Sequence, residues 1–245
     1  MYISQIGGKV KIVNKSKLPE VIHKYLSLDM YDHNKDKNHY SATELLKSTR
    51  EIVLTRRHSD EIEIDSADRI WSLFGSAVHL ALEQVEIGEA QEERLSTEID
   101  GYSISGKFDL IKDGTITDFK CTSAFTLVYK SRLLDWSKQL SIYRWLYAKT
   151  KKVILKDTGV IIAILRDWAA RNVKNGYPTS PIVEVPLKLM TLDETEKMIK
   201  DKLNDIREAH EKEDKDLPPC TIEETWKGKK CDKYCDVKGF CQRGK

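Results

Sequence analysis

The sequence has no apolar run approaching the ~20 residues that a membrane-spanning helix needs, and its first residues, Met1 to Val13, lack the apolar core of a signal peptide. It also has no internal repeat and no low-complexity segment. These absences argue against a membrane protein and a repeat protein. We therefore expect a soluble protein of the cytoplasm, which is the host cytoplasm if a phage encodes the chain.

An excess of charge of one sign is missing as well. The chain has 41 Lys and Arg residues against 39 Asp and Glu residues, which leaves a net charge of only +2. Any binding to nucleic acid must then come from local segregation of charge rather than from global basicity. With 40% hydrophobic and 33% charged residues over 245 positions, the composition suits one main globular domain with a small appendage.

Cysteine is absent from the first 120 residues, and Cys121 stands alone. The other four lie within the last 26 residues, separated by ten, three and five residues: Cys220, Cys231, Cys235 and Cys241. In a reducing compartment such clustering favours metal ligation over disulfides, and four thiolates suit either zinc or an iron–sulfur cluster. Four free, partly buried thiols are the alternative.

Ligation would attach a tail that is too poor in apolar residues to pack alone. The lysines of this tail would then form a basic rim able to contact phosphates: Lys227, Lys229, Lys230, Lys233 and Lys238. Cys121, which follows Lys120 directly, is interpreted as a small core residue.

Turn and capping signals predict the first part of the chain. A Gly7-Gly8 pair between β-prone runs predicts a hairpin over residues 2–13, followed by a helix over 18–28 and a polar loop over 32–38. Ser41 and Glu44 form a capping box for a helix through about Arg57. Apolar residues at helical spacing predict a further helix after Asp65 or Ser66, and His79 falls on it.

Strands and helices are mixed in the remainder. A period of two predicts a three-stranded meander over residues 93–121, with turns at Asp100-Gly101 and Asp113-Gly114. A long helix is predicted over residues 124–149, with a break near 134–135, and two strands are predicted over 160–165 and 182–185. A capping box formed by Thr191 and Glu194 predicts a last helix to about residue 211. We divide the chain into an N-terminal hairpin and helix (1–40), a core (41–215) and the cysteine tail (216–245).

An Asp-x-Lys triplet, Asp118-Phe119-Lys120, follows Asp109 on the neighbouring predicted strand. If Asp113-Gly114 is a two-residue turn, Lys112 pairs with Thr115, and counting back sets Asp109 opposite Asp118. Period two puts Lys120 on the face of Asp118 and turns the flanking apolar residues, Phe108, Leu110 and Phe119, into the core.

Two carboxylates at about 5 Å across a strand pair repel each other unless a cation lies between them. Mg²⁺ or Mn²⁺ prefers such oxygen ligands, lowers the pKa of a bound water and offsets charge on a scissile phosphate. Lys120 can orient that water or stabilise the transition state. The alternative is a surface hairpin whose Asp and Lys side chains are simply solvated. A lone histidine on an apolar helix, as His79 would be, is more often a buried, hydrogen-bonded residue than a metal ligand.

The order of these motifs resembles the RecB-like branch of the PD-(D/E)XK nuclease superfamily, whose relatives include AddB and the CRISPR-associated adaptation nucleases. Gly75-x-x-x-His79, Gly-Lys-Phe-Asp109, Thr-Asp118-Phe-Lys120 and Gln139-Leu-Ser-Ile-Tyr143 follow one another in the family order. The resemblance covers about residues 41–150 and resumes in the tail. It implies an α/β (α+β) fold of the restriction-endonuclease-like type, with a central mixed sheet flanked by helices and a small cysteine-ligated C-terminal cap.

The resemblance also implies the roles of individual residues. His79, Asp109, Asp118 and the Phe119 backbone carbonyl become ligands of Mg²⁺ or Mn²⁺, Lys120 becomes the catalytic lysine, and Gln139 with Tyr143 helps to hold DNA and shape the site. Asp118 stands where many relatives have Glu, and its charge is expected to preserve metal binding. Relatives with a C-terminal cysteine trio often carry a 4Fe-4S cluster closed by a cysteine before the core; here Cys220 has to supply the fourth ligand, and zinc stays an alternative.

The expected function is a metal-dependent deoxyribonuclease. We expect an exonuclease that acts on single strands or DNA ends in recombination, repair or phage and mobile-element DNA processing, with a recombination or helicase protein as a partner. Two alternatives are a non-catalytic nucleic-acid-binding module, and an adaptor subunit of a helicase–nuclease complex, since the chain has no G-x-x-x-x-G-K-[ST] loop of its own.

Overall fold

The structure is a computed structural model that describes residues 10–28, 36–85, 87–174 and 176–242. Backbone contacts divide the chain into two compact units. Residues 74–99 and 103–197 form one unit, and residues 1–73, 100–102 and 198–245 form the other. The hairpin predicted around Gly7-Gly8 lies outside the described residues. Among the helices that are described, none has the length and apolar character needed to cross a membrane.

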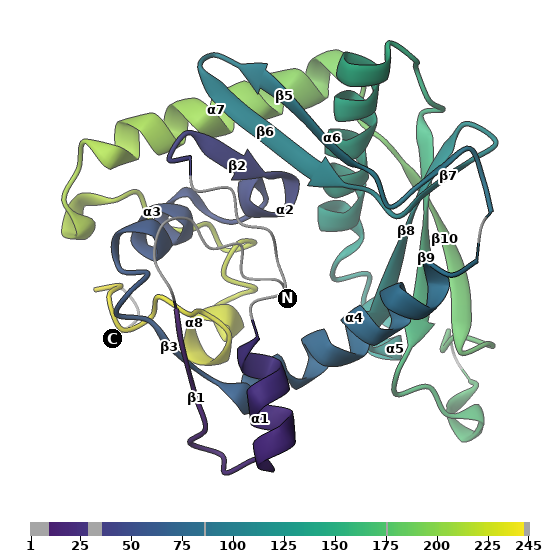
Figure 1. Ribbon diagram of the computed structural model, residues 1–245, viewed down its shortest axis with the longest axis horizontal. Helices are drawn as coiled ribbons and strands as arrows, with labels where there is room; N and C mark the ends of the chain where they lie inside the picture. Colours follow the sequence, from purple (N-terminus) through teal and green to yellow (C-terminus); the bar gives the residue numbers. More distant parts are fainter. Residues whose placement is uncertain (1–9, 29–35, 86, 175, 243–245) are drawn as a thin grey trace. The chain divides into compact units, whose positions relative to one another are not determined.

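A five-stranded mixed sheet is the framework of the 74–197 unit (Figure 1). Its strand order is β10-β9-β8-β7-β4. The strands are β4 (Ala90–Gln91), β7 (Leu110–Lys112), β8 (Thr115–Thr122), β9 (Thr158–Leu165) and β10 (Ile182–Lys188). β8 and β9 run parallel, whereas the other neighbours are antiparallel.

The parallel pair requires a crossover, because two parallel strands cannot be joined by a hairpin. α5 (Ala124–Val128) and α6 (Leu133–Lys151) supply it, and α6 packs against β8, β9 and β10. The middle of α6 is buried around most of its circumference, from Trp136 and Gln139 through Leu146. The predicted helix over 124–149 and its interruption are thus confirmed, with the break lying at residues 129–132.

The predicted meander over 93–121 is wrong in one respect. β5 (Arg94–Ile99) and β6 (Tyr102–Lys107) belong to a separate sheet, because the chain leaves the strand at Phe108 and Asp109 before β7 begins. Alternation continues through these residues, so the sequence carries no sign of a break. Tertiary contacts cause it: Phe108 is completely buried, and the Asp109 carboxylate accepts a hydrogen bond from the Phe119 amide.

Gly106 on β6 lies against the ring of Tyr143 on α6. A Cβ at this position would come within 2.7 Å and 2.8 Å of Cε1 and Cδ1 of that ring, and 3.0 Å of Leu146 Cδ1. We expect Gly106→Ala to lower the free energy of unfolding by about 1–3 kcal/mol, because the buried ring cannot move aside freely. Urea unfolding measures the change.

Gly239→Ala is the matched control, since nothing lies within 4 Å of its added Cβ. Its expected effect is within about 0.5 kcal/mol. An unchanged unfolding midpoint for Gly106→Ala would contradict the close packing of β6 on α6.

The other unit contains a parallel pair, β1 (Lys11–Val13) with β3 (Glu63–Asp65), and a core to which the cysteine tail contributes. Its remaining elements include α1 (Glu20–Ser27), β2 (His39–Ser41), α2 (Ala42–Leu45), α3 (Thr49–Arg57) and α8 (Lys229–Lys233). The buried core residues are Val10, Val53, Leu54, Ile62, Ile64, Ala209, Leu217 and Val237.

Capping residues decide where the helices begin. Ser41 accepts the Glu44 amide as predicted, but the helix that it opens ends at Leu45. Ser48 then accepts the Glu51 amide and opens α3, so the single helix predicted through Arg57 is two helices. The predicted helices around residues 70 and 192 are confirmed as α4 (Ile70–Leu82) and α7 (Leu192–His210), and Thr191 and Glu194 form the reciprocal capping box.

Candidate active site

Two buried carboxylates meet at the start of β7 and the middle of β8. The predicted pairing of Lys112 with Thr115 is confirmed, and the same register continues through Ile111–Ile116 and Leu110–Thr117. Asp109 precedes the paired residues by one position, and its Oδ2 accepts a hydrogen bond of 2.6 Å from the amide of Phe119. This hydrogen bond brings the Asp109 carboxylate to the strand segment that carries Asp118. Asp109 and Asp118 are only 6% and 2% exposed, which is unusual for Asp and marks a site with special partners.

The negative charge of Asp118 adds to the effect of burial on the pKa of Asp109. Burial and the charge of Asp118 raise the pKa of Asp109 to about 7, although His79 and Lys120 act in the opposite direction. Asp118 Oδ2 lies 2.5 Å from Lys120 Nζ, an ion pair along one face of β8, and accepts no hydrogen bond among the described residues. The two carboxylates therefore still repel each other, although Lys120 and His79 lie beside them.

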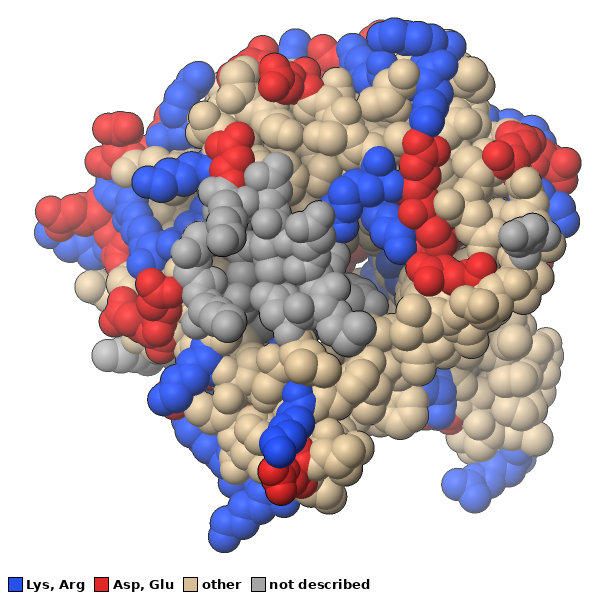
Figure 2. Space-filling model, in the orientation of Figure 1, with Lys and Arg blue, Asp and Glu red and all other residues tan. Residues whose placement is uncertain are grey.

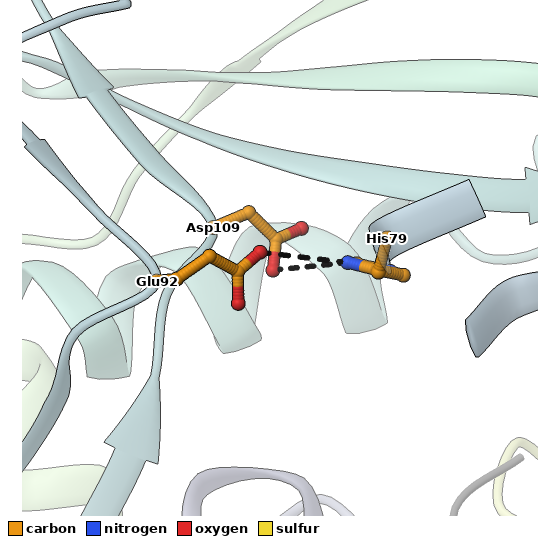
Figure 3. Close-up of side chains that lie close together, drawn as sticks. All are labelled: His79, Glu92 and Asp109. Atoms are coloured by element: carbon orange, nitrogen blue, oxygen red, sulfur yellow. Dashed lines mark ion pairs between the residues drawn. The ribbon is translucent and has the colours of Figure 1, made fainter. Parts of the chain in front are cut away.

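His79 and Glu92 complete a compact group around Asp109. His79 projects from α4, and Figure 3 shows its ring nitrogen pointing toward the carboxylates of both acids. The Nδ1 atom of His79 lies 3.5 Å from Asp109 Oδ1 and 3.9 Å from Glu92 Oε1. One potential ligand atom from each of the three residues lies within 4.8 Å of the other two.

The protonation of the group follows from these contacts. Burial disfavours the charged imidazole, but Glu92, Asp109 and Asp118 outweigh it and raise the pKa of His79. Burial likewise opposes ionisation of Glu92, yet His79 and Lys107 lower its pKa to about 2. The neighbouring carboxylates thus favour the charged form of the His79 imidazole.

Sequence reasoning missed Glu92. Glu92 lies just after β4, in a left-handed conformation with φ of 51°. Its backbone amide donates a hydrogen bond of 3.0 Å to the Asp109 carbonyl. Lys107 holds its carboxylate at 2.5 Å and also contacts Glu83 at 3.0 Å. No short motif carries Glu92. The pairing of Gln91 with Leu110 and the hydrogen bond between residues 92 and 109 bring it to the site.

The other predicted site residues occupy different positions. Gln139 Nε2 donates to the Tyr143 hydroxyl over 2.7 Å, and both side chains are buried on α6. The predicted role of this pair in holding DNA stays a prediction, as does ligation by the Phe119 carbonyl.

The donor set fits a hard divalent cation. It combines carboxylate oxygens with one imidazole, and such ions prefer oxygen ligands with an occasional nitrogen. A cation here would also relieve the repulsion that raises the pKa of Asp109. His79, Glu92, Asp109 and Asp118 are therefore the residues that would hold it.

The cysteine tail forms a second group, within the unit that contains residues 198–245. Arg50, which is 2% exposed, donates from Nε to Cys241 Sγ over 3.2 Å and from its other nitrogens to the carbonyls of Leu217 and Asp214. Cys220 lies 3.2 Å from the Ser48 hydroxyl. All four tail cysteines are half-buried, but no three of their sulfurs come within 4.8 Å of one another in the described part of the chain.

The model of the PD-(D/E)XK nuclease superfamily matches residues 89–242, a range that includes Glu92, Asp109, Asp118, Lys120 and the four tail cysteines. No curated protein matches the chain.

Several solved structures match the chain, among them the following two. The crystal structure of SSO0001 has a TM-score of 0.58 and 18% identity, covering 92% of this chain and 95% of its own. A protein from Eubacterium rectale that is named provisionally as an exonuclease has a TM-score of 0.35 and 11% identity, covering 79% of this chain and 71% of its own. The first supports the fold, whereas the second is too distant to support an argument.

A mixed sheet flanked by helices, with paired acids and a lysine on its central strands, is the arrangement expected of a nuclease core. Since the family model spans well over half of the sequence, the chain belongs to the PD-(D/E)XK nuclease superfamily. The members of this superfamily are nucleases, enzymes that hydrolyse phosphodiester bonds.

Proposed function

We propose that this chain is a Mg²⁺- or Mn²⁺-dependent deoxyribonuclease of the RecB-like branch. The convergence of His79, Glu92 and Asp109, with Asp118 and Lys120 on the adjacent strand, is the observation that carries the proposal. The motif order from Gly75 to Tyr143 supports the branch. We further propose that it degrades single strands or DNA ends as an exonuclease, with a recombination or helicase protein as partner.

In this proposal four side chains hold the cation, and Lys120 contacts the phosphate. His79, Glu92, Asp109 and Asp118 would hold the divalent ion, with the Phe119 carbonyl as a further ligand. When bound, this ion lowers the pKa of a water molecule and offsets charge on the scissile phosphate. Lys120 places an ammonium group beside Asp118, where it donates to a phosphate oxygen and stabilises the negative charge that develops during hydrolysis.

Incubation with DNA of four forms tests the activity. Purified protein is mixed with linear or circular DNA, single- or double-stranded, in Mn²⁺, Mg²⁺ or EDTA. We expect loss of linear DNA with Mn²⁺ or Mg²⁺ and none with EDTA, and survival of circles if the enzyme needs an end. Binding of DNA without cleavage under every condition would favour a non-catalytic binding module instead.

Glu92→Gln tests the ligand that the sequence did not reveal. The amide keeps the size of the side chain but removes the charge, and we expect the affinity for Mn²⁺ to fall about 10- to 100-fold, in the range found for groups that support metal sites. Calorimetric titration of Mn²⁺ measures this directly, without DNA. Glu98→Gln is the matched control, because Glu98 is exposed on β5. Equal affinities for the two variants would remove Glu92 from the ligand set.

For the cysteine tail we propose a 4Fe-4S cluster, held by Cys220, Cys231, Cys235 and Cys241 in a cap over residues 216–245. A tetrahedral zinc site, with Zn–S bonds of about 2.3 Å, needs sulfurs about 3.8 Å apart. Ligand type alone does not separate such a site from an iron–sulfur cluster, since both take four thiolates. A brown protein absorbing near ~400 nm supports the cluster, and a colourless protein with stoichiometric zinc supports the alternative.

A further inference from the structure

Three aromatic rings lie together just beyond the strand that carries Asp118 and Lys120. Phe125 on α5 stacks on Tyr129, with ring centroids 6.0 Å apart and planes 20° apart. Tyr177 meets the Phe125 ring edge-on, also at 6.0 Å. Phe125 and Tyr129 are 48% and 73% exposed. We call these three residues the aromatic platform.

The backbone beneath the aromatic platform is held in place by Asp167. Its carboxylate accepts the Ser123 hydroxyl at 2.5 Å and the Ala124 amide at 2.7 Å, which fixes the start of α5. The Tyr177 hydroxyl donates to the Asp167 carbonyl over 3.3 Å. Exposed rings on an anchored backbone lose little conformational freedom when a ligand stacks on them, which favours binding.

The aromatic platform is close to the candidate active site along the chain. Phe125 is five positions after Lys120, so their Cα atoms are at most about 18 Å apart even if the chain between them were fully extended. Figure 1 shows α5 following directly from the end of β8. A nucleic-acid strand can therefore reach both places within a few nucleotides.

The segments that carry the rings are basic. On the face shown in Figure 2, acidic and basic side chains are interspersed, in keeping with the net charge of +2. By contrast, residues 123–138 and 166–177 contain two acids, Asp135 and Asp167, against six basic residues: Lys130, Arg132, Lys138, Arg166, Arg171 and Lys174. Asp167 already accepts two hydrogen bonds from the start of α5. This local excess of positive charge suits a phosphate backbone.

We propose that the aromatic platform binds the bases of single-stranded DNA next to the active site. Exposed rings combined with nearby cations are the features by which proteins hold single strands, because every base offers a face for stacking. In a duplex these faces are occupied by neighbouring bases. The inference rests on the proposed nuclease function, since it names the form of the substrate.

Fluorescence anisotropy in EDTA tests the aromatic platform without cleavage. The probes are an oligothymidylate and an oligonucleotide of equal length with abasic sites, and the variants are Tyr129→Leu, Tyr129→Phe and Phe125→Leu. We expect Tyr129→Leu and Phe125→Leu each to weaken oligothymidylate binding about 5- to 150-fold, the equivalent of ~1–3 kcal/mol per stacked base. Tyr129→Phe keeps the ring and is expected to bind like the wild type.

Further readouts separate stacking from other effects. The leucine variants should bind the abasic probe as the wild type does, with an unchanged dependence on salt, because no phosphate contact is removed. Ile154→Ala, at a site 71% exposed, is the control for truncating a surface apolar side chain. Wild-type affinity of both leucine variants for oligothymidylate, or tighter binding of duplex than of single strands, would overturn the proposal.

Failure of the nuclease function would look different. If the wild-type protein prefers oligothymidylate to the abasic probe but never cuts DNA in Mg²⁺ or Mn²⁺, base binding by the aromatic platform is supported and the proposed nuclease function is refuted. If the wild type cuts DNA, and Tyr129→Leu and Phe125→Leu bind and cut it equally well, the nuclease function is supported and base binding by the aromatic platform is refuted.

Discussion

Replacing Lys120 or Asp118 by alanine is expected to abolish DNA cleavage while DNA binding persists. Lys120→Ala removes the ammonium group beside Asp118, and loss of one such charge-stabilising group costs about 10²- to 10³-fold in rate. Asp118→Ala removes a buried carboxylate proposed as a cation ligand, so the loss should be at least as large. Single-turnover cleavage of a labelled linear substrate, with binding measured in EDTA, gives both quantities.

Lys112→Ala is the matched control for the lysine. Lys112 lies on the same hairpin, at its exposed end beside the turn, and its loss should leave the rate close to that of the wild type. Thermal melts of all variants show whether the hairpin still folds. Cleavage at the wild-type rate by both Asp118→Ala and Lys120→Ala would refute the assignment of the site.

The second large effect is expected in the cysteine tail. If four thiolates hold a metal group, Cys235→Ser removes one ligand, and the tail loses a contribution that amounts to about 10–16 kcal/mol in small zinc-ligated peptides. Even a net loss of ~4 kcal/mol lowers the melting temperature of a chain of this size by roughly 10 °C. Elemental analysis for iron and zinc, together with thermal unfolding, measures the two consequences.

Cys121→Ser is the control, because Cys121 is also half-buried but lies on β8, outside the tail. It should retain the metal content of the wild type. If Cys235→Ser and Cys121→Ser both retain that metal content and melt at the same temperature, the tail cysteines are free thiols. Apolar packing on the core and polar contacts such as those of Arg50 then hold the tail without a metal.

The hairpin that carries the acid pair was predictable because its signals are local. Asp113 and Gly114 adopt φ values of 49° and 66°, the left-handed conformation that a tight hairpin turn requires. With that turn fixed, strand alternation decides which side chains share a face, and the observed register agrees. The capping boxes at Ser41 and Thr191 are predictable for the same reason, since donor and acceptor lie three residues apart.

The break at Phe108 and the position of Glu92 could not be predicted in this way. Both depend on contacts between segments that are distant along the chain. Phe108 turns into the core, while Asp109 is fixed by the Phe119 amide ten residues away. Glu92 reaches the site through the Asp109 carbonyl, and Lys107 then holds its carboxylate.

The sequence by itself determined the turn at Asp113-Gly114, the strand register beside it and the spacing of the four tail cysteines, because these follow from turn type, strand period and order along the chain. Only the tertiary structure decided that Glu92 joins His79 and Asp109, and that the half-buried Tyr177 meets the exposed rings of Phe125 and Tyr129. The physical reason is that such groups depend on how elements pack against one another, and packing is a property of the whole core rather than of any local pattern.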